Sequence, residues 1–178
     1  MPRYSRKKIK SFFTKADAAR TTAEKGKLLE DLACYLFEAV PGISQSARDM
    51  KNTYETEEID VAFWNERHAR GLKELNFLLL VECKNWAAPV GSIEVNWFIS
   101  KIRNRALDFG VLIAAHGITG SADDKKQAHD VVSKALMDGV RIVILTRGEI
   151  EALNSSDELV ATLKRKLCEL IVSGTIWP

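Results

Sequence analysis

The chain has 178 residues, of which 46% are hydrophobic and 28% are charged, so it is long enough for one ordinary domain with a real core and too short for two. Its unbroken apolar runs, such as residues 77–81, are far shorter than the roughly 20 residues that span a bilayer. No apolar segment follows the basic N terminus as a signal peptide would require. We therefore expect a soluble cytoplasmic protein with no membrane segment. The three cysteines and three histidines lack the spacing of a disulfide framework or a zinc site.

The net charge of +2 hides an uneven distribution of charge. Residues 1–27 hold nine lysines and arginines, opposed only by Asp17 and Glu24. Such a run is typical of a segment that binds nucleic acid through phosphate charge, and equally of a solvated terminus. We divide the chain into a basic N-terminal arm, residues 1–20, and a single domain, residues 21–178.

The first predicted helix begins at Thr21-Thr-Ala-Glu24, which has the spacing of a capping box, and Pro41-Gly42 ends it. Beyond it, the patterns predict a weak strand at 43–51, a strand at 59–64, a loop at 65–74 and a continuously apolar strand at 76–84. A loop at 86–91, a helix at 93–107 and a strand at 109–115 follow. The last predicted elements are a helix at 121–137, opened by a capping signature at Ser121 and closed by Gly139, a strand at 140–145 and a helix capped at Ser155. Hairpin strands come first and helix-separated strands later. We therefore expect an α/β fold whose sheet is antiparallel at first and parallel afterwards.

Charged residues stand at the end of the most apolar strand, where the sequence reads Val81-Glu-Cys-Lys84. Side chains alternate along a strand, so Glu82 and Lys84 share a face. Asp60 on the preceding strand is within hairpin reach of both. Two carboxylates from adjacent strands, with a backbone carbonyl (that of Cys83) and water, suit Mg²⁺. We expect Glu58 to face away from Asp60 and leave it out of this site.

A metal ion held there would polarise a phosphoryl oxygen and activate a water molecule, while Lys84 would orient that water or stabilise the transition state. The alternative is an ordinary salt bridge between Glu82 and Lys84 at the end of a strand. Charges that follow a buried apolar run are rare unless they are paired or functional. The position of the two residues therefore favours a site.

Further candidates are open to two interpretations. Trp86 and Trp97 could stack on bases or simply pack. Lys101, Arg103 and Arg105 could contact phosphate or form a solvated helix face.

Several segments carry a resemblance to a known family: Glu-Lys-Gly-Lys-Leu-Leu-Glu (24–30), Glu-Ile-Asp (58–60), Val-Glu-Cys-Lys-Asn-Trp (81–86), Pro-Val-Gly (89–91) and Phe-Gly-Val-Leu-Ile-Ala-Ala (109–115). From about Lys25 to about Leu145, the chain resembles the PD-(D/E)XK superfamily of restriction-endonuclease-like nucleases, and within it the Mrr-like branch. The resemblance implies a three-layer core with a central mixed sheet flanked by helices.

The same resemblance implies roles for individual residues. Asp60 and Glu82 would be metal ligands, Lys84 the catalytic lysine, and Glu30 the helix glutamate that completes the metal site directly or through water. Independent support for Glu30 is its place beside the apolar stripe of its helix, one turn after Gly26, whose missing side chain would allow close approach.

We therefore expect a Mg²⁺-dependent DNA endonuclease, with Mn²⁺ as a substitute, that hydrolyses phosphodiester bonds by metal-activated water in restriction or defence against foreign DNA. The resemblance suggests 5′-phosphate products and action as a homodimer, and a partner protein is one source of specificity. Two alternatives stay open: a non-catalytic DNA-binding or assembly module with the same fold, and a nuclease that resolves DNA junctions.

Overall fold

The computed structural model describes residues 2–51, 57–85, 87–120 and 128–175. The elements in these residues are α1 (Arg6–Ala18), α2 (Thr22–Phe37), β1 (Ile43–Lys51), β2 (Glu58–Asn65), β3 (Leu78–Lys84), α3 (Ser92–Arg103), β4 (Phe109–Ala114), α4 (Ala128–Met137), β5 (Arg141–Leu145), α5 (Arg147–Ala152) and α6 (Ser156–Ser173). None of the helices within the described ranges combines the length and the apolar character that a membrane span needs.

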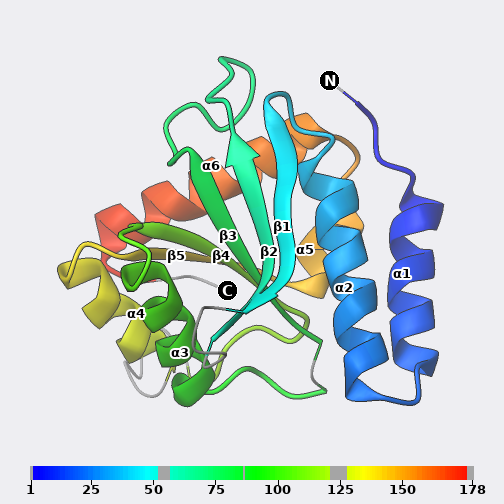
Figure 1. Cartoon of the computed structure of the whole chain (residues 1–178), viewed down its shortest axis with the longest axis horizontal. Coiled ribbons are helices and arrows are strands. Elements are labelled where there is room, and N and C mark those ends of the chain that lie inside the picture. The colour runs from blue at the N-terminus through cyan, green and yellow to red at the C-terminus, as the bar shows by residue number, and fades with distance from the viewer. Residues whose placement is uncertain (1, 52–56, 86, 121–127, 176–178) are drawn as a thin grey trace.

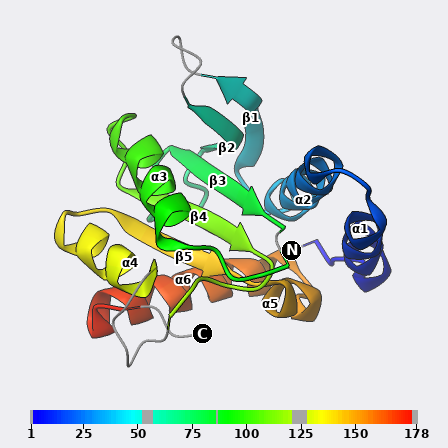
Figure 2. The ribbon, with the colours of Figure 1, turned by 90° about the horizontal axis from the view of Figure 1, so that it is seen from below.

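The strands form one mixed sheet in the order β1-β2-β3-β4-β5. The β1–β2 and β2–β3 pairs are antiparallel, and the β3–β4 and β4–β5 pairs are parallel. Helices α3 and α4 cover one face, and α1, α2, α5 and α6 lie on the other (Figures 1 and 2). The predicted α/β fold, with its antiparallel part first, is confirmed.

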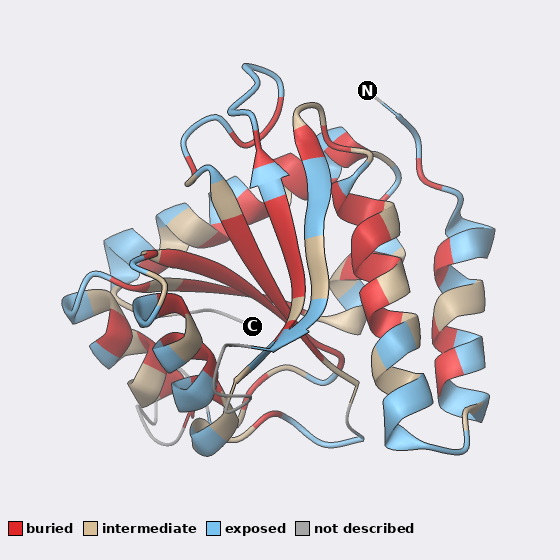
Figure 3. Cartoon of the chain, viewed as in Figure 1, coloured by how far each residue is buried: buried red, intermediate tan, exposed pale blue. Residues whose placement is uncertain are grey.

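The core is divided in two by the sheet, and β3 contributes to both halves. Leu79 and Val81 point into the cluster under α2 and α6, whereas Leu80 points into the cluster under α3 and α4. This two-sided burial explains the continuous apolar run of β3 and is visible in Figure 3. Gly110 in β4 lets α3 pack closely, because an added Cβ would lie 2.5 Å from Cδ1 of Ile102.

Residues 1–20, which we expected to form a basic arm, contain a helix. Residues 6–18 form α1, which packs against α2 (Figure 1). Its inward face carries Ile9, Phe13 and Ala16, which are buried at helical spacing, while its lysines lie outside. No helix was predicted for these residues, because the density of charge hid a narrow apolar stripe.

The helix caps were predicted with mixed success. Thr21 forms a capping box with Glu24, and Ser155 accepts a hydrogen bond from the backbone of Glu158, as expected. The short helix α5, capped by Thr146, was not expected. The predicted cap at Ser121 lies outside the described residues. Gly139 follows α4 with a φ of +81°, which confirms the predicted helix end.

Candidate active site

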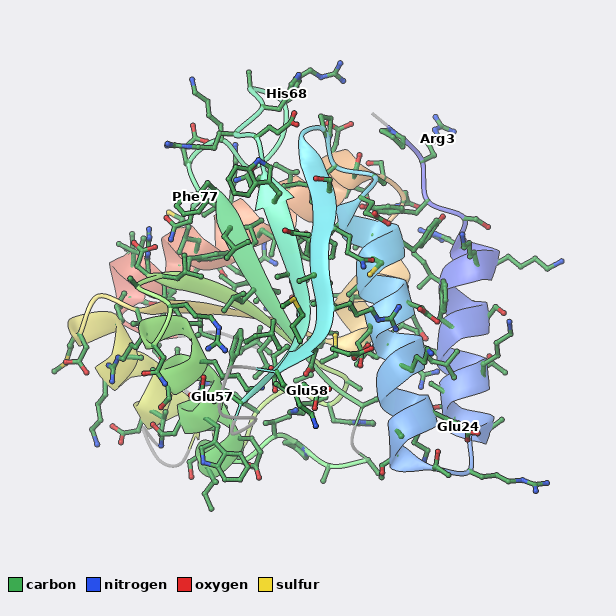
Figure 4. All side chains as sticks on the ribbon, in the orientation of Figure 1. Arg3, Glu24, Glu57, Glu58, His68 and Phe77 are labelled. Carbon is green, nitrogen blue, oxygen red and sulfur yellow. The ribbon has the colours of Figure 1, made fainter. Side chains whose placement is uncertain are left out.

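A fork between β2 and β3 creates the site. The two strands pair only from Val61–Trp64 to Leu78–Val81. Beyond that point, Glu58 and Ile59 of β2 pair with β1, and residues 82–84 of β3 pair with β4. Asp60 and Glu82 are therefore the first residues past the point where the strands separate. The fork lies at the end of the sheet where Figure 4 labels Glu57 and Glu58, opposite His68 and Phe77.

Asp60 spans the opening of this fork. Its Oδ2 accepts a hydrogen bond of 2.7 Å from the backbone N–H of Cys83. Cys83 lies beyond the residues of β3 that pair with β2. Burial and the negative charge of Glu82 raise the pKa of Asp60 to about 6, although the hydrogen bond and the charges of Lys84 and Lys101 oppose the shift. The carboxylate of Asp60 is therefore held in place, but its charged form is disfavoured.

Glu82 lies at the centre of a cluster of charges. Its side chain is only 5% exposed, and Nζ of Lys84 is 2.8 Å from its Oε1. Nζ of Lys101, which comes from α3, is 2.8 Å from Oε1 and 2.7 Å from Oε2. Burial disfavours the charge of Lys84, but Glu82 and Asp60 raise its pKa above the ordinary value. Lys84 therefore stays protonated at neutral pH.

Glu30, on α2, lies beside Asp60 at this site, but its carboxylate is bound by an arginine. Oε2 of Glu30 accepts a hydrogen bond of 2.8 Å from Nε of Arg48. Arg48 also binds Asp31 at 2.6 Å and the backbone carbonyl of Lys27 at 3.0 Å. Burial raises the pKa of Glu30 to about 7, with Arg48 acting against the shift.

A cavity of about 240 Å³ joins these elements, lined by Thr22, Lys25, Gly26, Glu30, Glu58, Asp60, Cys83, Lys84 and Asn85. Gly26 leaves room there, since a Cβ added to it would meet only Oε1 of Glu30, at 3.8 Å. The expectation that Glu58 faces away from Asp60 was wrong. Residues two apart in a strand share a face, so Glu58 and Asp60 both reach this cavity.

The donor set fits a small divalent cation. Within the described ranges, no three His, Cys, Asp or Glu side chains lie close enough together to share a metal ion. Asp60 and Glu82 instead make a pair of carboxylates whose mutual repulsion raises the pKa of Asp60. Mg²⁺ is commonly held by one or two carboxylates, with water completing its octahedron. The two residues, with the neighbouring carbonyl of Cys83, are donors of that kind.

The other candidates from the sequence are distributed around the site. Trp97 is exposed on α3, and Trp86 lies outside the described residues. Arg103 pairs with Asp138, and Arg105 pairs with Glu57.

Two contacts of the candidate site were missed from the sequence: Lys101 was considered only for phosphate, and Arg48 was not considered. The place of Lys101, next to the buried residue Ile102 of α3, is a weak signal that it points toward the sheet. Arg48 gives no comparable signal.

The forked sheet with an Asp–Glu–Lys cluster defines a restriction-endonuclease-like core, as predicted. The model of the restriction endonuclease family Mrr_cat matches residues 21–146, from the N-cap of α2 to the N-cap of α5. The chain therefore belongs to this family, and the predicted Mrr-like branch of the PD-(D/E)XK nucleases is confirmed. A search among curated proteins gave no significant match.

Proposed function

We propose that this chain is a divalent-metal-dependent DNA endonuclease with Asp60, Glu82 and Lys84 as its active centre. The observation that supports the proposal is the convergence of these three side chains where β2 and β3 separate. An ordinary salt bridge at the end of a strand would not need a second, half-buried carboxylate beside it. The charge of Asp60 beside Glu82 is electrostatically unfavourable, and groups with perturbed pKa values of this kind cluster at functional sites.

Each residue has a distinct role in the proposed hydrolysis. Asp60, Glu82 and the carbonyl of Cys83 would hold Mg²⁺, with Mn²⁺ as a substitute. The bound ion supplies Lewis acidity toward a phosphoryl oxygen and lowers the pKa of water. Lys84, kept protonated by the carboxylates, orients the attacking water and stabilises negative charge on the phosphoryl group.

Glu30 has an indirect role in this proposal. Its carboxylate faces the cavity but is bound by Arg48. We therefore assign Glu30 to the outer part of the metal site, where it acts through water. A variant at Glu30 should weaken cleavage less than variants at Asp60 or Lys84.

The test is cleavage of supercoiled plasmid with Mg²⁺ or Mn²⁺ by wild type, Asp60→Asn and Lys84→Met. The wild type should nick or linearise the plasmid, and both variants and EDTA should reduce the rate by at least about 100-fold. Glu74→Gln is the matched control, because it removes a carboxylate from the loop at the other end of β2 and β3. It should cleave like the wild type.

The same experiment separates the proposal from a non-catalytic DNA-binding module. Binding of DNA by all proteins, with cleavage by none on duplex, single-stranded or branched DNA, would favour the module. Faster cleavage of a four-way junction than of linear duplex would identify a junction-resolving nuclease. Products should carry 5′-phosphates, which end-labelling after phosphatase treatment would detect.

The biological setting that we propose is restriction or defence against foreign DNA, consistent with the family. Expression of the wild type should lower the plating efficiency of incoming phage or plasmid, and expression of Lys84→Met should not. We further propose that the protein acts as a homodimer, since cutting both strands requires two centres. Light scattering with and without DNA tests this, and a need for cell extract in the cleavage assay would indicate a specificity partner.

A further inference from the structure

Lys101 donates hydrogen bonds to both carboxylate oxygens of Glu82. Its Nζ lies 2.8 Å from Oε1 and 2.7 Å from Oε2, and Lys84 forms an ion pair with Oε1 at 2.8 Å. The Lys101 side chain is 14% exposed and that of Glu82 is 5% exposed. Lys101 thus places a cation on the oxygens that the proposed function reserves for a metal.

The backbone of Lys101 is held by contacts at the C-terminal end of α3. The carbonyl of Lys101 accepts a hydrogen bond of 2.8 Å from Nη1 of Arg105, and the same nitrogen lies 2.8 Å from Oε2 of Glu57. Asn104 donates to the other oxygen of Glu57 at 2.6 Å. Glu57 immediately precedes β2, so these bonds join the end of α3 to the strand that carries Asp60. The backbone at Lys101 is therefore anchored beside the fork.

We propose that Lys101 is a built-in counter-ion that a divalent cation must displace from Glu82, so that Lys101 sets the affinity of the site for metal. This inference rests on the proposed function, because it requires Glu82 to be a metal ligand. The ammonium and the cation compete for the same two oxygens, and their like charges repel each other strongly at such short range. Binding of one lowers the affinity for the other by the same factor.

The counter-ion also explains how the buried carboxylate of Glu82 is tolerated beside Asp60 before metal binds. Without Lys101, Glu82 would keep the ion pair with Lys84, next to the carboxylate of Asp60. Removal of one partner from a buried ion pair is strongly destabilising. Lys101 therefore stabilises the metal-free fold and opposes metal binding, and these two effects should appear with opposite signs in one variant.

The test compares Lys101→Met with wild type by calorimetric titration with Mn²⁺ and by thermal melting. Lys101→Met should bind Mn²⁺ about tenfold more tightly or better, within the usual range of coupling between two sites. In EDTA it should melt at a lower temperature than wild type, and saturating Mn²⁺ should close or reverse this difference. Lys101→Arg keeps the charge and should bind Mn²⁺ within about threefold of wild type, which is under 1 kcal/mol.

The control is Arg103→Met, which removes a positive charge from the same helix but pairs with Asp138 away from the fork. It should leave the Mn²⁺ affinity unchanged. Equal or weaker Mn²⁺ binding by Lys101→Met would overturn the counter-ion role while leaving the proposed nuclease site intact. Absence of Mn²⁺ binding by wild type, as by Asp60→Asn, would overturn the metal site itself and this inference with it. If Lys101→Met does not fold, unchanged affinity in Lys101→Gln overturns the role, and tighter binding supports it.

Discussion

Replacement of Asp60 by asparagine should stabilise the metal-free protein at neutral and alkaline pH. Burial and the charge of Glu82 raise the pKa of Asp60 from 3.8 to about 6. Because the folded protein holds this proton more tightly than the unfolded chain does, the contribution of Asp60 to stability is complete below pH 4. It is lost as the pH rises from about 4 to about 6. Above that range, the wild type carries a carboxylate in a place that disfavours it.

The size of the effect follows from the shift in pKa. A shift of about two units corresponds to about 3 kcal/mol, at 1.36 kcal/mol for each unit. Asparagine removes the charge, and its Oδ1 can still accept the hydrogen bond of Asp60 from the N–H of Cys83. At pH 8 in EDTA, Asp60→Asn should therefore be more stable than wild type by up to about 3 kcal/mol, a rise in melting temperature of up to about 10 °C for a chain of this size.

Urea unfolding in EDTA at pH 4, 5, 6, 7 and 8 measures this difference directly. The gap between variant and wild type should be small at pH 4, grow through pH 6 and then level off. Glu74→Gln, an exposed carboxylate, should show no such profile. Mn²⁺ should stabilise the wild type and leave Asp60→Asn nearly unchanged. A variant that is less stable than wild type at pH 8, or a gap that does not change with pH, would refute the electrostatic reasoning.

Two further predictions concern the residues around the site. Arg48→Met should destabilise the protein by about 3 kcal/mol at pH 9, because it leaves the carboxylate of Glu30 without its cation. This loss of stability should shrink below pH 7, where Glu30 takes up a proton. Urea unfolding at pH 5 and pH 9 would detect the difference. Equal losses at both pH values would contradict the pairing of Arg48 with a charged Glu30. Gly110→Ala should cost about 1–3 kcal/mol, because its Cβ would lie 2.5 Å from Ile102 and 2.7 Å from Phe98. A loss in urea unfolding below about 0.5 kcal/mol would show that α3 moves away without penalty.

The elements that could be predicted from the sequence are those whose signal is local. The buried strand at 76–84 is visible as a continuous apolar run, and the helix that follows Thr21 is announced by its capping box. The grouping of Glu82 with Lys84 follows from alternation along one strand. These inferences need only neighbouring residues, because backbone geometry sets the spacing.

Predictions failed where two local signals competed or none existed. Residues 6–18 carry both a charge run and an apolar stripe, and the stripe decides the structure because it can be buried against α2. Glu58 was set aside although alternation places it with Asp60. The short α5 contains one buried residue, Ile150, which is too little periodicity to recognise.

The sequence by itself determined the α/β class, the change from antiparallel to parallel strand pairing and the choice of Asp60, Glu82 and Lys84 as the candidate centre. Only the tertiary structure decided which charges neutralise these carboxylates. Lys101 reaches Glu82 of β3 from helix α3, and Arg48 reaches Glu30 across 18 positions of the chain. The physical reason is that secondary structure follows from local sequence, whereas the electrostatic environment of a buried carboxylate depends on every element that folds around it.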